Sequence, residues 1–150
     1  MGGKCSHLSL ESARCLDQRW LGAGALRHTY GMNLTRFTRA RANVFVREIN
    51  VSLPFYCEIL GFTVQIQHTG FALLSRDDAE LALVESQSFV KQKAAVCYID
   101  VEGVVELSKQ VTASEAVVDQ AIRDHPWGMR DFVVVDPDGN KIAIGERIVT

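Results

Sequence analysis

Histidine and cysteine are the residue types most often used for metal binding and nucleophilic chemistry, and this chain has four of each. The cysteines show no Cys-x-x-Cys spacing, and Cys57 and Cys97 lie in apolar stretches where a thiol acts as a small hydrophobic group. The sequence also contains no nucleophile elbow and no phosphate-binding glycine loop. It therefore predicts no zinc site, disulfide framework or catalytic triad, and indicates a reduced, cytoplasmic protein. We expect the histidines to be surface residues: His7, His28, His68 and His125.

An aromatic residue on a short turn is a stronger functional signal. The tripeptide Pro126-Trp127-Gly128 directly precedes a predicted strand. Two roles are open for the indole: a lid over the core, or a platform on which a flat ligand ring stacks. Arg130 is a further candidate ligand contact, although it can equally pair with Asp131 or Asp124 at the surface.

A C-terminal hairpin, residues 131–146, must hold this turn in place. Its connection, Asp136-Pro137-Asp138-Gly139, has the side-chain acceptor, fixed φ and glycine that a type I turn requires. Earlier in the chain, a helix is predicted to begin at Asn50 or Ser52 and to end at Gly61. The remaining predicted elements are strands 43–47, 62–67, 71–75, 80–85 and 94–101, a helix at 104–111, and a weak strand at 116–118.

This order repeats a β-α-β-β-β module, about 42–86 and 94–147, and predicts an α+β fold with a curved mixed sheet in one domain, residues 42–150. Residues 1–41 differ, with seven basic and two acidic side chains, and are expected to be a leader or a disordered extension. Met32 is a possible start, and a transit peptide is an alternative. The rest carries nine basic and sixteen acidic groups, which disfavours nucleic acid and suits a cationic ligand. No stretch is long enough to span a membrane.

Several short motifs occur in a characteristic order between residues 43 and 146. They are Val46-Arg47-Glu48-Ile49, Ser52, Phe55-Tyr56, Leu60-Gly61-Phe62 and Asp136-Pro137-Asp138-Gly139-Asn140. In this combination the chain resembles the vicinal-oxygen-chelate superfamily of glyoxalases, bleomycin-resistance proteins and extradiol dioxygenases. Residues 71–85 and the segment 126–132 are most similar to the bleomycin-resistance proteins, which bind their ligand stoichiometrically without metal. The chain lacks a proline near Ala42, which leaves open whether N-terminal arms are exchanged in a dimer.

The resemblance also implies where metal-dependent relatives hold their ion. The matching positions are Arg41, Ala82, Val96 and Ala143, and none of these side chains coordinates a divalent cation. Glu85 lies three residues past one of them and would face inward only if the strand register slipped. No cofactor and no catalytic residue are therefore predicted.

Strand parity predicts a ligand-binding cup instead. One face of the predicted strands is apolar, as a face covered by helices requires, and carries Val44, Val46, Leu81, Leu83, Ala95, Cys97, Ile99, Ile142 and Ile144. The other face mixes aromatic, small and polar groups: Asn43, Phe45, Ala82, Val84, Val96, Tyr98, Asp100, Lys141 and Ala143. Filling of a small barrel is the alternative role for Phe45 and Tyr98. With the resemblance, the predicted ligand-binding residues are Asn43, Phe45, Tyr98, Asp100, Trp127, Arg130 and Phe132.

Together these features predict a metal-free homodimer whose acidic clefts sequester a small aromatic molecule, either neutral or cationic, such as a bleomycin-like antibiotic. A metal-dependent lyase, isomerase or dioxygenase of the same superfamily is one alternative. An effector-sensing or interaction module that uses the same cup is another.

Overall fold

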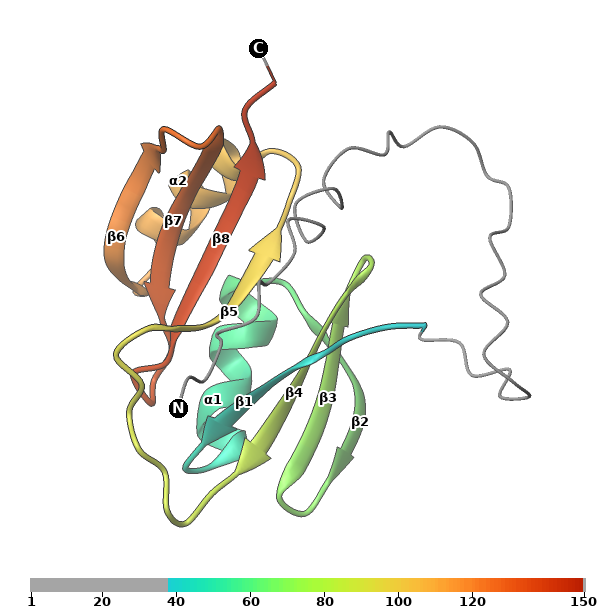
Figure 1. Ribbon diagram of the computed structural model, residues 1–150. Helices are drawn as coiled ribbons and strands as arrows, with labels where there is room; N and C mark the ends of the chain where they lie inside the picture. The colour runs from blue at the N-terminus through green and yellow to red at the C-terminus, as the bar shows by residue number, and fades with distance from the viewer. Residues whose placement is uncertain (1–37, 150) are drawn as a thin grey trace, which may run out of the picture. The chain divides into compact units, whose positions relative to one another are not determined.

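The computed structural model describes residues 38–149 (Figure 1). The predictions for the leader, the start at Met32, and the histidines and cysteines before residue 38 lie outside these residues. Residues 38–41 are exposed and lead into the first strand. Arg39 and Arg41 both form ion pairs with Glu80.

The first module has the predicted β-α-β-β-β order. Its elements are β1 (Ala42–Val46), α1 (Ile49–Pro54), the π-helical turn η1 (Phe55–Ile59), β2 (Thr63–His68), β3 (Phe71–Arg76) and β4 (Ala79–Glu85). The strands form one sheet in the order β1-β4-β3-β2, with β1 parallel to β4 and the other pairs antiparallel.

The first helix differs from the prediction at its start. Its N-cap is Glu48, which makes no side-chain capping bond, and the backbone N–H of Ile49 donates to Glu85 Oε1 at 3.0 Å instead. Ser52 is therefore not a cap but a fully buried helical residue. The helix continues through Pro54 and widens to π geometry immediately after it, because proline has no N–H for the preceding turn.

The second module repeats the order, and its second strand is longer than expected. Its elements are β5 (Ala95–Asp100), α2 (Val104–Ala113), β6 (Val117–Asp124), β7 (Met129–Val135) and β8 (Lys141–Arg147). The strand order is β5-β8-β7-β6, with β5 parallel to β8. The predicted strand at 116–118 is thus only the first part of β6, which continues to Asp124 with two irregularities in its pairing to β7.

One hydrophobic core joins the two modules. Buried residues from both sheets and both helices belong to a single cluster, and β1 and β5 lie next to each other. Figure 1 shows α2 covering one side of β6 and β7. The side of the two sheets that faces away from the helices is called the open face below. It carries, among others, Asn43, Phe45, Tyr98, Gln120, Asp131 and Ala143.

The β7–β8 connection binds the second module to the first. Asp136 accepts a hydrogen bond from the buried Tyr56 hydroxyl at 2.8 Å, and Asp138 accepts one from Ser52 at 3.0 Å. The Asn140 amide donates to the carbonyl of Phe45 at 2.8 Å. The predicted turn is present, with a backbone bond of 2.9 Å from Gly139 to Asp136 and a positive φ of 89° at the glycine. No helix within residues 38–149 is long and apolar enough to cross a membrane.

Candidate functional site

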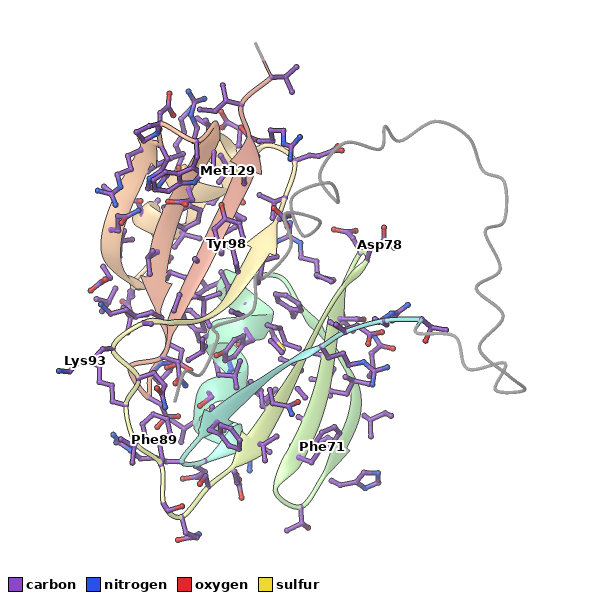
Figure 2. The ribbon with its side chains drawn as sticks, in the orientation of Figure 1. Phe71, Asp78, Phe89, Lys93, Tyr98 and Met129 are labelled. Carbon is purple, nitrogen blue, oxygen red and sulfur yellow. The ribbon has the colours of Figure 1, made fainter. Side chains whose placement is uncertain are left out.

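A row of residues crosses the open face of the second sheet. Tyr98 on β5 pairs with Ala143 on β8, which pairs with Val133 on β7 and then with Gln120 on β6. Figure 2 shows Tyr98 on this sheet and Phe71 on the first. Tyr98 remains 44% exposed, so its ring is available at the surface.

Asp131 is the centre of a polar cluster next to this row. Its carboxylate accepts a hydrogen bond from Gln120 at 3.0 Å and a longer one from the Tyr98 hydroxyl at 3.4 Å, and lies 2.7 Å from His125 Nε2. The side chains of Asp131 and His125 are only 11% and 8% exposed. Gly145 makes this arrangement possible, because a Cβ atom there would overlap the Tyr98 hydroxyl and lie 2.8 Å from Asp131 Cβ. The cluster is therefore fixed from several strands.

Trp127 lies at the edge of this cluster, on the turn between β6 and β7. The turn is closed by a backbone bond of 3.0 Å from Gly128 to His125, and Gly128 has a positive φ of 81°. The indole stacks on the His125 ring with 4.3 Å between centroids and 23° between planes. It is nevertheless 69% exposed and belongs to no part of the described core. The role as a lid over the core is excluded in this conformation.

The carboxylates of Asp131 and Asp100 place negative charge around Tyr98. Burial raises the Tyr98 pKa, and the charge and hydrogen bond of Asp131 and the charge of Asp100 raise it further. The phenol is therefore a neutral donor near pH 7. Arg130 does not neutralise this group, because its guanidinium forms two hydrogen bonds to Asp124, at 2.5 and 2.9 Å. The same contact lowers the Asp124 pKa.

The structure places the other predicted ligand residues in different surroundings. Phe45, 50% exposed, and Asn43 of the first module line a hollow of about 330 Å³, together with Phe89 of the connection between the modules and Asn140 of the second module. Asp100 is exposed at the end of β5, at the mouth of a separate cavity described below. The candidates thus form no single group within one chain.

Phe132 is not in the cup, and this prediction is wrong for the described conformation. Its side chain is 1% exposed and belongs to the hydrophobic core. It pairs with Ile144, whose parity is that of the helix-covered face, whereas its neighbour Asp131 points to the open face. The alternation of side chains along β7 indicates that Phe132 faces the helices. Phe132 was predicted as a ligand contact only because it belongs to the segment 126–132 that contains Trp127.

The predicted alternation of side chains between the two faces of the sheet is also broken at the start of β5. Ala95 pairs with Lys141 and Cys97 with Ile142, so two residues of β5 oppose one of β8 and form a bulge. Ala95 is consequently exposed, which differs from its prediction on the helix-covered face. Val96 packs against the core and also lines the hollow that contains Asn43 and Phe45.

The four positions that match metal ligands in the resemblance have clear alternative roles. Arg41 pairs with Glu80, Ala82 and Ala143 are buried, and Val96 packs against the core. The nearby Glu85 accepts the first backbone bond of α1. Between residues 38 and 149 no three or more His, Cys, Asp or Glu side chains gather as a metal site would require.

Sequence reasoning missed His125 and its partners. Of the two histidines in the described part, His68 is exposed as expected, but His125 is mostly buried by its neighbours. The signal available was the pair His125 and Asp131 on either side of a predicted turn. Gln120 could not be included, because it lies in the part of β6 that was not predicted.

Two tandem β-α-β-β-β modules with an aromatic and polar open face define a protein of the glyoxalase-like fold. The profile of the Glyoxalase/Bleomycin resistance protein/Dioxygenase superfamily matches residues 38–144. The chain belongs to this superfamily.

Similar proteins include several bleomycin resistance proteins. A bleomycin resistance protein from Geobacillus stearothermophilus is 31% identical over 122 residues, which cover 69% of this chain and 92% of the relative. A bleomycin resistance protein from Staphylococcus aureus shows the same values. Among solved structures, the bleomycin resistance determinant encoded on transposon Tn5 has a TM-score of 0.65 at 20% identity, covering 75% of this chain and all of that one. A superfamily member from Sphaerobacter thermophilus also has a TM-score of 0.65 at 20% identity, over 75% and 98% of the two chains. These structures support the fold.

Proposed function

We propose that this protein binds a flat aromatic cation of the bleomycin class, without metal, and protects the cell by sequestering it. The observation that carries the proposal is the exposed indole of Trp127 held by His125. One face of the indole is stacked and the imidazole behind it is fixed by Asp131, so the other face is a rigid surface for a second ring.

Charge and composition support the same ligand class. Tyr98 offers an exposed aromatic ring beside two carboxylates, Asp131 and Asp100, and Arg130 is already paired. A ligand that is both flat and cationic gains from the rings and from the negative potential together. The 31% identity to bleomycin resistance proteins favours this class over other aromatic cations.

A homodimer in the cytoplasm is part of the proposal. Phe45 and Trp127 are 50% and 69% exposed, on the first and second modules of the chain. Two-fold assembly would let the first module of one protomer cover the second module of its partner, so that each cleft has two walls. A binding role is favoured over an enzymatic one because Arg41, Ala82, Val96 and Ala143 occupy the positions where the resemblance places metal ligands.

The direct test is a titration of full-length protein with metal-free bleomycin in the presence of EDTA, followed by tryptophan fluorescence and calorimetry. We expect saturable quenching and a loss of about tenfold or more in affinity for Trp127→Ala, since one aromatic contact contributes on the order of 1 kcal/mol or more. Trp20→Phe is the matched control, because it removes the other indole of the chain. Unchanged bleomycin affinity in Trp127→Ala would remove the platform from the mechanism.

Expression of the same variants in a bleomycin-sensitive host tests the biological role. Wild type and Trp20→Phe should raise the tolerated bleomycin concentration, and Trp127→Ala should raise it less. Protection by none of them, with binding intact in vitro, would exclude resistance as the function.

A further inference from the structure

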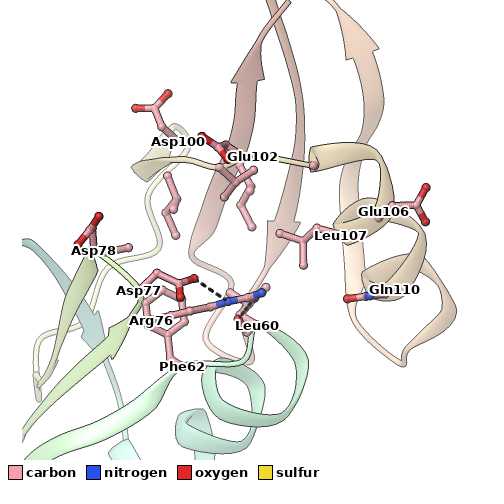
Figure 3. A pocket seen from close by; sticks show the side chains of 15 residues that line it. Leu60, Phe62, Arg76, Asp77, Asp78, Asp100, Glu102, Glu106, Leu107 and Gln110 are labelled. Atoms are coloured by element: carbon pink, nitrogen blue, oxygen red, sulfur yellow. Dashed lines mark hydrogen bonds and ion pairs between the residues drawn. The ribbon is translucent and has the colours of Figure 1, made fainter.

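A second cavity of about 690 Å³ lies between the two modules, on the side of the helices (Figure 3). Its floor is apolar: Leu60, Phe62, Ile99, Leu107 and Ile144. Its rim consists of the β3–β4 turn on one side, and the end of β5 and the start of α2 on the other. The volume is that of a drug-sized ligand site. The cluster of Tyr98, His125, Trp127 and Asp131 contributes nothing to it.

The cavity exists because the two modules have connections of unequal length at equivalent places. The β7–β8 connection has five residues, 136–140, and they reach α1 and η1 through hydrogen bonds to Ser52 and Tyr56. The β3–β4 connection has only two, Asp77 and Asp78, because Arg76 already pairs with Ala79. This short turn faces α2 but leaves the space in front of Leu107 unfilled.

The rim has an excess of negative charge over this apolar floor. The Arg76 guanidinium donates to the carbonyl of Leu60 at 2.6 Å and lies 3.8 Å from Asp77. On α2, Glu106 is paired with Lys109 at 2.8 Å. The remaining rim carboxylates are Asp78, Asp100 and Glu102, and they form no ion pair with any residue from 38 to 149.

We propose that this inter-module cavity is a second ligand site, which binds a small organic cation through its apolar body on Leu60, Phe62 and Leu107 and its charged group at the rim. Apolar groups of the ligand gain from burial on the floor. A cationic group relieves the mutual repulsion of the rim carboxylates, whereas an anionic group is repelled. Of the residues assigned to the open-face site above, only Asp100 also lines this cavity, and the proposal does not depend on the bleomycin site.

Three probes that share one apolar body test this charge selectivity on the full chain: 4-phenylbutylammonium, 4-phenylbutanol and 4-phenylbutyrate. Two-dimensional amide NMR reports the location, with the backbone amides of Gly103 and Gln110 for the cavity and the indole N–H of Trp127 for the open face. We expect the ammonium compound to shift Gly103 and Gln110 with an affinity about tenfold above that of the alcohol, and the carboxylate to be weakest.

A charge-neutral double variant completes the test. Asp78→Asn with Glu102→Gln should weaken the ammonium compound about tenfold and leave the alcohol unchanged, since both side chains are exposed and the fold does not need them. Glu115→Gln, an exposed carboxylate outside the cavity, is the matched control and should change neither affinity.

Three results would overturn the proposal: equal affinity for the ammonium and the alcohol, a response at Trp127 in place of Gly103, or full ammonium affinity in the double variant. Concentration-dependent shifts of Gly103 without any probe would also overturn it, because they would mean that a second copy of the chain fills the cavity. None of these results affects the bleomycin titration at Trp127, so the two proposals fail separately.

Discussion

Removal of one hydroxyl group tests how firmly the two modules are joined. Tyr56 is 0% exposed and donates to Asp136 Oδ2 at 2.8 Å. A buried hydrogen bond to a charged group contributes about 1.5–3 kcal/mol. Without the Tyr56 hydroxyl, the Asp136 carboxylate still accepts three hydrogen bonds, from the backbone of Asp138 and from the backbone and side chain of Asn140. Its buried charge therefore remains hydrogen-bonded. We therefore expect Tyr56→Phe to lower the free energy of unfolding by about 2 kcal/mol.

Tyr98→Phe is a matched control with the same chemical change and also a carboxylate partner. Its hydroxyl lies 3.4 Å from Asp131, and the residue is 44% exposed, so water replaces the lost bond. The expected loss is about 0.5 kcal/mol or less. The assay is urea unfolding followed by far-UV circular dichroism at one fixed protein concentration, since the proposed dimer would make stability depend on concentration. Equal losses in the two variants would refute the reasoning from burial and distance.

The pH dependence provides a second measurement on the same pair. Burial raises the Tyr56 pKa well above its ordinary value, and the charge of Asp136 and their hydrogen bond raise it further. The unfolded chain releases this proton above about pH 10, while the folded protein retains it. Stability from Tyr56 is therefore complete below about pH 10 and declines as the pH rises further. The difference between wild type and Tyr56→Phe should narrow above that pH by up to about 1.4 kcal/mol per unit.

Three further predictions concern metal, assembly and thiol chemistry. Protein purified without chelators should contain far less than one equivalent of zinc, nickel, manganese or iron by elemental analysis, and one metal per chain would restore the enzymatic alternative. Light scattering at micromolar concentration should give the mass of a dimer, and a monomer would leave each cleft with one wall. Burial, followed by the charge of Asp136, raises the Cys97 pKa to about 11. Alkylation of this thiol should therefore be slow at pH 8 and accelerate as the pH approaches 11, and rapid alkylation at pH 8 would contradict its burial.

The parts of the fold that could be predicted from the sequence are those that depend on residues close together in the chain. The β7–β8 turn was predicted because Asp136, Pro137 and Gly139 each satisfy a requirement that depends only on neighbouring residues. The second half of β6 was missed because its polar residues interrupt the alternation, and because its pairing with β7 is irregular. The bulge before Cys97 likewise depends on β8, which lies about 45 residues later in the chain.

The candidate site was predicted only in part, for a related reason. Trp127 stood out because of its own tripeptide, but the burial of His125 depends on residues that tertiary structure brings to it. Asp131 appeared to be a surface partner of Arg130, whereas Arg130 selects Asp124 and Asp131 turns to the open face. An assignment from single residues cannot decide between two such neighbours without the strand that faces them.

The docking of residues 136–140 on the first module has a consequence for synthesis on the ribosome. Tyr56 and Ser52 emerge about 80 residues before Asp136 and Asp138, their hydrogen-bond acceptors. Until that segment has left the exit tunnel, the first module lacks the contacts that satisfy these two hydroxyl groups, and its apolar core lacks the second sheet. Such long-range closure slows folding, because chain entropy is lost before the contacts are gained. A chain that stalls before residue 136 should therefore keep its first module incompletely folded, which makes it a substrate for chaperones and proteases.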